Sequence, residues 1–345
     1  MQATAYAAKD TKAQFEPMQI ERREPKPDDV VIEIAYSGIC HSDIHTARGE
    51  WAGTQYPCVP GHEIVGHVIQ VGKKVKKFKL GEPVGVGCMV DSCKKCESCK
   101  KGEEQFCEKS PTYTYNSPAK EGGYTFGGYS SHIVVRQDFV LKIKKGQALD
   151  RIAPLLCAGI TTYSPLKRYG TKKGKKVGVV GLGGLGHMAV KIAKAMGAEV
   201  TVFSTSPEKE ADAKKLGAKH FVLSKNPENF APLAKKFDLI INSVSASHNL
   251  TPYLTSLKND GTMVLLGVPP EFSQVSAGAL IGGRKRLTGS LIGGIKETQE
   301  MLNFCAAKKV FSDIELIDAA DINKAYDRTV NGDVKYRFVI DAKTF

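Results

Sequence analysis

Four cysteines stand close together in the sequence, at intervals that suit a metal ion. They form the pattern C-x2-C-x2-C-x7-C within a lysine-rich stretch, at Cys93, Cys96, Cys99 and Cys107. Four thiolates so spaced can close a tetrahedral zinc shell and leave no coordination position open. An iron–sulfur cluster, a disulfide pair and a nucleic-acid-binding zinc ribbon are the competing interpretations. The spacing favours a structural zinc ion in the loop 88–108.

A glycine-rich hexapeptide in the middle of the chain has the pattern G-x-G-x-x-G. It follows an apolar run and opens a stretch with helical periodicity that stops at Gly197. Glycines in this context let the backbone approach a pyrophosphate, whose charge is stabilised by the N–H groups of the helix start. The sequence therefore predicts a dinucleotide site at Gly181, Leu182, Gly183, Gly184, Leu185 and Gly186.

The choice of dinucleotide is read about twenty residues further on, where an acidic side chain would accept the ribose hydroxyls of NAD and repel a 2′-phosphate. This chain has three hydroxyl residues there, Ser204, Thr205 and Ser206, followed by Lys209. Hydroxyl donors and an ammonium group favour NADP(H). The same residues also suit a simple capped helix start, with Ser206 before a proline and Lys209 in solvent.

The elements that must hold these residues differ between the two halves of the chain. Residues 1–150 alternate short β-rich runs with Gly/Pro breaks, which favours an irregular, mostly β domain. From Lys175 strand and helix signals alternate, which predicts a doubly wound parallel α/β sheet in residues 151–292. We expect residues 293–345 to return to the first domain. The strands predicted for the sheet are 177–180, 200–203, 220–223, 239–244, 263–267 and 287–292.

A second set of metal-binding residue types is widely separated: Cys40, His62 and Cys157. Each alone would be read as a core residue. Together with G-H-E-x-x-G at 61–66, the four-cysteine loop and the glycine motif, they make the chain resemble the zinc-dependent medium-chain alcohol dehydrogenases. The resemblance spans essentially the whole chain. It implies a GroES-like catalytic domain and a Rossmann domain, with a catalytic zinc on two cysteines and one histidine and an open fourth position.

Within that family the chain is most similar to the cinnamyl-alcohol dehydrogenase group of NADPH-dependent aldehyde reductases. The resemblance implies that Asp43 orients the imidazole of His62 and that Glu63 is a transient ligand or an outer carboxylate. It makes Ser42 and His45 the proton relay. The supporting segments are Cys40-His41-Ser42-Asp43, Pro60-Gly61-His62-Glu63, Gly127-Gly128-Tyr129-Ser130, Leu156-Cys157-Ala158-Gly159 and the hydroxyl triplet before Lys209.

The same resemblance implies further cofactor contacts. Thr161 would touch the nicotinamide ribose, and the backbone near Gly267, Val268, Ser290 and Ile292 would line the cofactor. Trp51, the only tryptophan, is a wall of the substrate pocket by family resemblance, or else an exposed hydrophobic residue or a packing anchor.

The implied activity is hydride transfer between NADPH and an aldehyde, with oxidation of a primary alcohol as the reverse reaction. Zinc would polarise the carbonyl and stabilise the developing alkoxide. A zinc polyol dehydrogenase is the enzymatic alternative, although its relatives usually have glutamate as the third ligand where this chain has Cys157. The presence of two sets of metal-binding residues disfavours a zinc-free quinone reductase. A nucleotide-binding regulatory protein without turnover is the non-catalytic alternative.

Composition limits the partners and the location. The formal charge is +13, but the lysines stand in short clusters without a nucleic-acid-binding motif, so we expect no nucleic acid partner. The chain has neither the apolar stretch of a membrane helix nor a signal peptide at its start, which predicts a cytoplasmic protein without membrane contact. Its nine cysteines then serve as metal ligands or thiols. The family resemblance implies a homodimer joined near Leu287 to Ile292.

Overall fold

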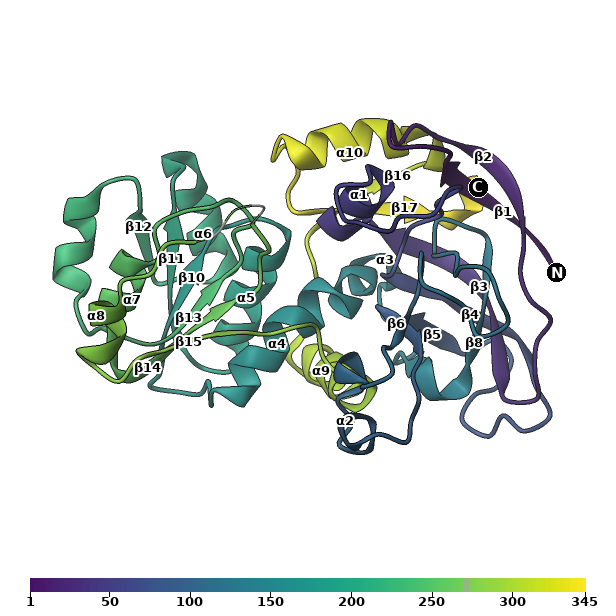
Figure 1. The fold of residues 1–345 in the computed structure, drawn as a ribbon, viewed down its shortest axis with the longest axis horizontal. Coiled ribbons are helices and arrows are strands. Elements are labelled where there is room, and N and C mark those ends of the chain that lie inside the picture. The colour runs from purple at the N-terminus through teal and green to yellow at the C-terminus, as the bar shows by residue number, and fades with distance from the viewer. Residues whose placement is uncertain (270, 272) are drawn as a thin grey trace. The chain divides into compact units, whose positions relative to one another are not determined.

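The computed structural model describes residues 1–269, 271 and 273–345 (Figure 1). It contains two large sheets of different construction. Unit 1 comprises Met1–Cys157, Gly293–Ala306 and Phe311–Phe345, and unit 2 comprises Ala158–Ile292 and Ala307–Val310. The first change of unit therefore falls a few residues beyond the boundary that we expected at 150.

Unit 1 is built on a seven-stranded sheet with the order β16-β17-β3-β4-β5-β9, in which β8 also pairs with β3. The last strand of the chain, β17, pairs antiparallel with β3 from its first part. The strands are β3 (Asp29–Gly38), β4 (Ile64–Val71), β5 (Pro83–Val86), β8 (His132–Arg136), β9 (Leu141–Lys142), β16 (Ile314–Ile317) and β17 (Arg337–Asp341).

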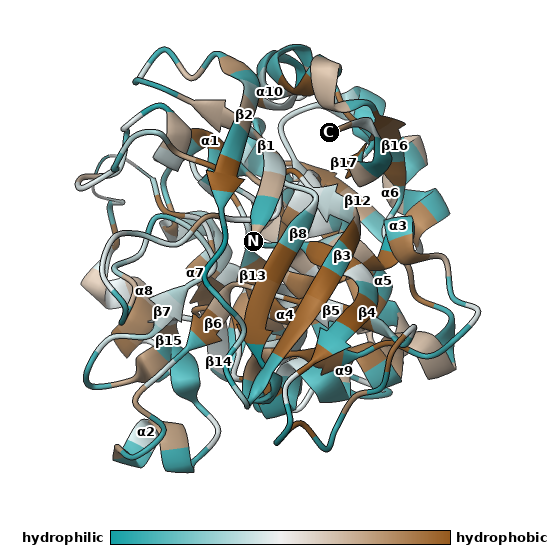
Figure 2. Cartoon of the chain, turned by 90° about the vertical axis from the view of Figure 1, so that its right-hand side faces the viewer, coloured by the Kyte–Doolittle hydropathy of each residue, from teal (hydrophilic) through white to brown (hydrophobic). Residues whose placement is uncertain are grey.

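In β3, a central strand of this sheet, buried apolar residues follow one another instead of alternating with polar ones. Val30, Val31 and Ile32 of β3 are all fully buried, which indicates that both faces of the strand are covered. Figure 2 shows the same hydrophobic colour along β3, β4 and β8. A second apolar cluster joins Phe15, Tyr129, Tyr326 and Phe338 from distant parts of the sequence. The core of unit 1 is therefore completed by the C-terminal segment.

Shorter elements surround the sheet of unit 1. Two separate hairpins consist of β1 (Gln2–Ala8) with β2 (Phe15–Glu21) and of β6 (Met89–Asp91) with β7 (Thr112–Tyr113). The longest helix, α9, has 14 residues, and no described helix has the length and apolarity needed to cross a membrane. The helices are α1 (His41–Ala47), α2 (Glu97–Lys100), α3 (Leu149–Ile152), α9 (Ile295–Lys308) and α10 (Ile322–Val330).

Unit 2 contains a six-stranded, fully parallel sheet with the order β12-β11-β10-β13-β14-β15. The strand order reverses between β10 and β13, and open α/β sheets bind ligands beyond the carboxyl ends of the strands at such a point. The strands are β10 (Lys176–Val180), β11 (Glu199–Ser204), β12 (His220–Leu223), β13 (Phe237–Asn242), β14 (Leu257–Leu265) and β15 (Arg286–Gly289).

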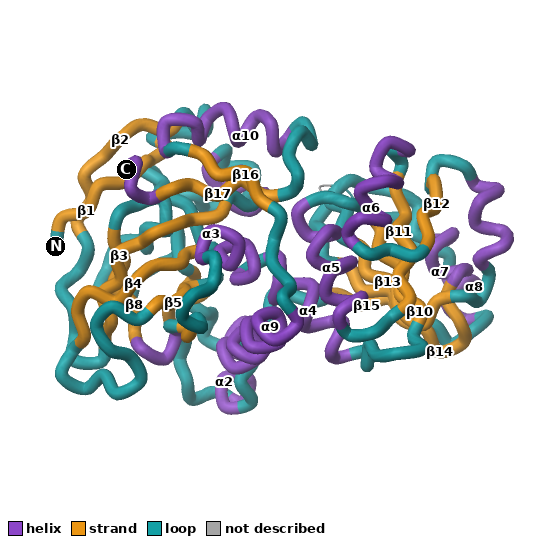
Figure 3. The backbone as a smooth tube through the Cα atoms, turned by 180° about the vertical axis from the view of Figure 1, so that it is seen from behind, coloured by secondary structure: helices purple, strands orange, loops and turns teal. Residues whose placement is uncertain are grey.

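Helices cover both faces of this sheet. Figure 3 shows α5 and α6 on one side and α7 and α8 on the other, as a doubly wound connection requires. The predicted apolar face of α5 is buried at Met188, Ala189, Ile192 and Ala193, and α4 packs against the same helix. The helices are α4 (Ala158–Arg168), α5 (Gly184–Ala195), α6 (Glu210–Leu216), α7 (Thr251–Ser256) and α8 (Ala277–Ile281).

All six strands predicted for this sheet are present, but three of them differ from the prediction by two or more residues at one end or both. The strand predicted at 287–292 begins at Arg286 and ends at Gly289, because its neighbour β14 ends opposite it at Leu265. Ile292 has a φ of 37°, which no strand residue adopts. The strand predicted at 239–244 ends at Asn242, and the one predicted at 263–267 begins earlier, at Leu257.

Candidate active site

The first part of the site is the junction between β3 and α1. Cys40 stands at the N-cap of α1, and its backbone N–H donates to Asp43 Oδ2 over 2.8 Å. An acidic side chain in the first turn of a helix is favoured because it accepts from the free N–H groups there. This contact fixes Asp43 inside the protein, where its side chain is fully buried.

The second part is the tight loop before β4. His62 Nδ1 lies 3.0 Å from Asp43 Oδ1, and Gly61 N donates to the same oxygen over 3.2 Å. Gly61 has a φ of +105°, which explains why glycine stands before the histidine. Because Asp43 accepts a hydrogen bond from Nδ1–H, the proton of the neutral imidazole stays on Nδ1 and Nε2 of His62 is left with a lone pair for a metal ion.

The third part is Cys157, which lies between a 3-10 turn (Ala153–Leu156) and α4. Its Sγ is 3.9 Å from Cys40 Sγ, and both side chains are buried. Ligand atoms of Cys40, His62, Glu63 and Cys157 all lie within 4.8 Å of one another. The structure thus brings together residues that are more than a hundred positions apart.

This donor set fits a zinc ion. Two sulfur atoms and one imidazole nitrogen are ligands that zinc prefers, with tetrahedral geometry. Glu63 is fully buried, its Oε1 pairs with Arg337 of β17, and its Oε2 is buried without a hydrogen-bond partner. An unpartnered buried carboxylate oxygen is costly, so its place beside three soft donors suits a cation.

The charges around the cluster favour one thiolate. A hydrogen bond from the Cys157 thiol, with the positive charges of Arg337 and His62, holds the pKa of Cys40 well below its usual range despite burial. The same hydrogen bond, with one to Cys88, raises the pKa of Cys157. Desolvation would lower the pKa of His62, but the charges of Asp43 and Cys88 together with hydrogen bonds to Asp43 and Cys40 outweigh it and raise that pKa well above the usual value.

The two proposed relay residues project from α1 beside this cluster. Ser42 Oγ lies 3.8 Å from Cys40 Sγ. His45 Nδ1 lies 2.5 Å from Glu50 Oε2, and its ring stacks on Trp51 with the centroids 5.2 Å apart. Trp51 is 42% exposed, so it contacts His45 without being a core anchor. Glu50 was missed in the sequence, although it stands only five residues after the histidine.

The four-cysteine loop forms a second cluster in unit 1. The Sγ atoms of Cys93, Cys96, Cys99 and Cys107 also lie within 4.8 Å of one another. Cys93 Sγ accepts hydrogen bonds from Lys95 N and Cys96 N, and these lower the pKa of its thiol to about 6. No carboxylate or imidazole belongs to this group, which therefore has the closed sulfur shell of a structural zinc site.

The glycine motif of unit 2 has the geometry of a phosphate loop. Gly181, directly after β10, has a φ of +88° and donates to Phe203 O over 2.9 Å. A side chain at Gly183 would meet nothing within 4 Å, so the backbone there is open to a ligand. A side chain at Gly186 would collide with Gly181 O where α5 packs on the loop. These are the three glycine functions of a dinucleotide fold.

The hydroxyl triplet lies at the carboxyl end of β11. Ser204 Oγ accepts from Ser206 N over 3.1 Å, and Thr205 is exposed. Lys209 lies in a short 3-10 helix, Pro207–Lys209. Ser206 makes no side-chain capping bond to that helix, so capping does not explain this serine.

The remaining predicted cofactor residues also belong to unit 2. Thr161 lies on α4, and its Oγ1 is buried without a hydrogen-bond partner. Gly267 and Val268 follow the end of β14, where Val268 is 68% exposed, and Ser290 N donates to Leu265 O over 3.2 Å. Ile292 is buried and therefore presents little side chain to a ligand.

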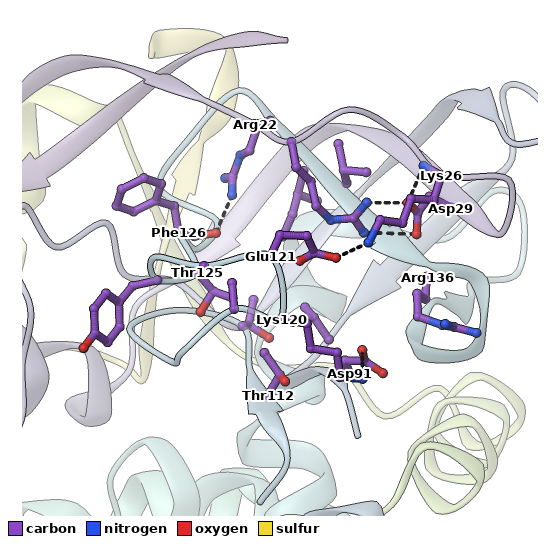
Figure 4. Close-up of a pocket in the computed structure, with 18 of the residues that line it drawn as sticks. Arg22, Lys26, Asp29, Asp91, Thr112, Lys120, Glu121, Thr125, Phe126 and Arg136 are labelled. Atoms are coloured by element: carbon purple, nitrogen blue, oxygen red, sulfur yellow. Dashed lines mark hydrogen bonds and ion pairs between the residues drawn. The ribbon is translucent and has the colours of Figure 1, made fainter. Parts of the chain in front are cut away.

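A separate cavity of about 300 Å³ in unit 1 includes none of the four residues of the mixed cluster in its lining (Figure 4). Its charged side chains largely neutralise one another. Lys26 pairs with Glu121, and Lys120 pairs with Asp91. This cavity could not be predicted from the sequence, because its walls come from β2, β3, β6, β7, β8 and several loops that are far apart in the chain.

Comparisons with known proteins agree with this arrangement. Aldehyde reductase YahK of Escherichia coli is 56% identical over 347 aligned positions that cover 100% of this chain and 99% of that protein. The chain belongs to the zinc-dependent medium-chain alcohol dehydrogenases. Residues 26–145 match the alcohol dehydrogenase GroES-like domain, and residues 184–307 match the zinc-binding dehydrogenase domain. The predicted family and the predicted α/β fold are thereby confirmed.

Other members of the alcohol dehydrogenase family are similar over the whole length. NADP-dependent alcohol dehydrogenase C of Mycobacterium tuberculosis is 52% identical, covering 98% of this chain and 97% of that protein. Cinnamyl alcohol dehydrogenase from Sorghum bicolor superimposes with a TM-score of 0.97 at 44% identity, covering 99% and 98% of the two chains. CAD from Helicobacter pylori, solved with NADP(H), superimposes with a TM-score of 0.94 at 45% identity, and the alignment covers 99% of both chains.

Proposed function

We propose that this alcohol dehydrogenase is a zinc- and NADPH-dependent aldehyde reductase that also oxidises primary alcohols in the reverse direction. The observation that carries the proposal is the buried cluster of Cys40, His62, Glu63 and Cys157, within 4.8 Å of one another. The names of its relatives, an aldehyde reductase and NADP-dependent alcohol dehydrogenases, support the substrate and the cofactor.

Zinc in this cluster supplies a Lewis acid for the substrate oxygen, and NADPH supplies the hydride. Cys40, His62 and Cys157 hold the metal, while Asp43 keeps His62 in the tautomer that presents Nε2. Glu63 stays paired with Arg337 and is the fourth side chain within reach of the metal.

Ser42 and His45 supply the proton that the reduced substrate requires. The Ser42 hydroxyl, beside Cys40 Sγ, donates a proton to the oxygen of the reduced substrate. His45 replaces that proton from solvent, since its side chain is 28% exposed and its Nδ1 is held by Glu50.

Unit 2 binds the cofactor in this proposal. The open backbone at Gly183 and the N-terminus of α5 suit the pyrophosphate. Lys209 and the hydroxyl groups of Ser204, Thr205 and Ser206 suit the 2′-phosphate, because hydroxyl residues rather than a carboxylate stand at the carboxyl end of β11. The unpartnered Thr161 hydroxyl suits the nicotinamide ribose, and Gly267, Val268, Ser290 and Ile292 are assigned to the cofactor by family resemblance alone.

The test is a rate panel on zinc-loaded protein with aromatic, cinnamyl and aliphatic aldehydes, each with NADPH and with NADH. We expect NADPH oxidation with at least one aldehyde class, and zinc-loaded protein that turns over none of them contradicts the proposal. Ser42→Ala should lower turnover on the order of 100-fold without loss of zinc. Ser276→Ala, an exposed serine before α8, is the matched control. Equal turnover in both variants would remove Ser42 from the mechanism.

We also propose that the chain forms homodimers in the cytoplasm. The edge strand β15 of the six-stranded sheet offers unpaired backbone groups to a second copy, and Leu291 beside it is exposed. The cytosol would keep the metal-binding thiols reduced. Light scattering of the purified protein tests the dimer, and a monomer at micromolar concentration contradicts it.

A further inference from the structure

The segment Gly127-Gly128-Tyr129-Ser130 docks directly on the loop that carries His62. Three consecutive backbone hydrogen bonds join them: Gly127 N to Val59 O (2.7 Å), Gly128 N to Gly61 O (2.9 Å) and Tyr129 N to Pro60 O (3.0 Å). The segment belongs to the family resemblance in the sequence, but none of the proposed catalytic steps uses it. Its contacts end at the residue before the metal-binding histidine.

Two glycines make this close approach possible. A side chain at Gly127 would collide with the carbonyl oxygens of Pro60 and Gly61. A side chain at Gly128 would collide with Ile64 and with Ser37 Oγ. The segment therefore lies at backbone contact distance from the His62 loop, which a larger residue would prevent.

Arg22 holds the segment from the other side, at the wall of the cavity in Figure 4. Its Nη1 donates to Phe126 O over 2.5 Å, and its Nη2 donates to Gly127 O over 2.8 Å and to Ser130 Oγ over 2.6 Å. The guanidinium is 7% exposed, so these bonds lie in the interior. A buried cation thus fixes the backbone before Gly128 and the Ser130 side chain after it.

The side chain of Tyr129 reaches Asp43. Its hydroxyl donates to Asp43 Oδ2 over 3.3 Å, and both side chains are fully buried. Asp43 already accepts from Cys40 N, Gly61 N and His62 Nδ1. A carboxylate has about four acceptor sites, so the tyrosine hydroxyl completes the set.

A second tyrosine orients the first. Tyr326 of α10 donates its hydroxyl proton to Tyr129 OH over 3.3 Å. Phe15 packs edge-on against both rings, with centroid distances of 5.8 Å to Tyr129 and 4.9 Å to Tyr326. The donor direction then runs from Tyr326 to Tyr129 to Asp43, and His62 donates to the same carboxylate.

We infer that Tyr129 is a positioning residue, which completes the hydrogen bonds of Asp43 and so fixes the metal-binding imidazole of His62. The inference rests on the proposed function, because it assigns His62 to a metal. Without the Tyr129 hydroxyl, Asp43 Oδ2 keeps only Cys40 N, and the buried hydroxyl of Tyr326 loses its acceptor. Outer partners of metal-binding histidines affect metal affinity by about 10- to 100-fold.

The experiment is Tyr129→Phe in the full-length chain, which removes one oxygen and keeps the ring. Zinc release to a chelator should show two phases, and the phase missing in Cys157→Ser identifies the mixed cluster. We expect Tyr129→Phe to weaken zinc at that cluster about tenfold and to leave the four-cysteine loop unchanged. The His62 Nδ1–H resonance, observed after selective 15N labelling of the eight histidines, should shift. Tyr253→Phe, a buried tyrosine of unit 2, is the matched control.

Two outcomes overturn the inference. One is unchanged zinc affinity and an unchanged His62 resonance in Tyr129→Phe. The other is a lower melting temperature with zinc affinity unaltered, which would make the tyrosine structural only. If Tyr129→Phe does not fold, Tyr326→Phe replaces it and should shift the His62 resonance in the same direction but less. Both readouts need no substrate, so a chain without aldehyde reductase activity would refute the proposed function and not this inference.

Discussion

The two metal clusters of unit 1 are assembled in opposite ways. The four-cysteine loop takes all its ligands from Cys93 to Cys107, and its backbone N–H groups support its own thiolates. The mixed cluster takes its ligands from three distant segments and depends on Asp43 and Arg337 around them. A local cluster needs only a short loop, whereas an assembled cluster needs most of the unit. The four-cysteine loop is therefore a site that stabilises the fold, whereas the mixed cluster is a site that the rest of the fold must hold together.

The largest effect should follow from breaking the assembled cluster. We expect Cys157→Ser to lower aldehyde turnover on the order of 1,000-fold or more, because the substrate loses its Lewis acid. Zinc content should fall from two ions to one per chain, with the four-cysteine loop still loaded. Metal analysis and steady-state rates measure both. Cys305→Ala, which removes a buried thiol of α9, is the control. Turnover that survives Cys157→Ser would place the chemistry elsewhere.

Breaking the local cluster should damage stability instead. Cys93→Ser opens a closed metal shell, whose binding energy contributes to folding. A loss of about 3 kcal/mol would lower the melting temperature by about 4 °C in a chain of this size. Turnover per correctly folded molecule should change less than about twofold, since this loop contributes no group to the proposed chemistry. Calorimetry beside active-site titration separates the two quantities. A large fall in turnover at unchanged stability would show that the four-cysteine loop contributes to the chemistry, and would contradict its assignment as a purely structural site.

A third change tests a function that involves neither cluster. Lys209→Met removes an ammonium group from the proposed 2′-phosphate site, and one charge-assisted hydrogen bond is worth about a factor of 10 in binding. We expect the KM for NADPH to rise about tenfold, the KM for NADH to stay constant and both zinc ions to be retained. Lys214→Met, on the exposed face of the next helix, is the control. Equal changes for both cofactors would refute the assignment of Lys209.

The smallest effect concerns Asp29, a buried carboxylate that belongs to neither metal cluster. Desolvation would raise the pKa of Asp29, but hydrogen bonds from Arg23 and from Lys26 N outweigh it and hold the pKa below its usual range. A lowered folded-state pKa contributes stability that is present above the unfolded value, about 3.9, and is lost as the pH falls through the folded value. Asp29→Asn should therefore lower the melting temperature by about 1 to 2 °C at neutral pH. The difference from the unmodified chain should shrink below pH 4; a constant difference would show that packing, not charge, is responsible.

The sequence predicted the local cluster and the dinucleotide loop because their residues are neighbours in the chain. The three glycines of the motif have separate functions, and the parallel pairing of the six strands was predicted from alternating strand and helix signals, although their order was not. The assembled cluster was recognised only through its resemblance to a family, since Cys40, His62 and Cys157 carry no spacing signal. Its surroundings could not be predicted, because Arg337 and Tyr129 reach the site through tertiary folding alone.

The ion pair between Glu63 and Arg337 spans 274 residues of sequence. A ribosome must therefore add 274 residues after the glutamate before it can meet its cation, whereas the last of the four cysteines follows the glutamate by only 44 residues. During synthesis the structural ion can be captured early, and the electrostatic environment of the reactive ion is completed last.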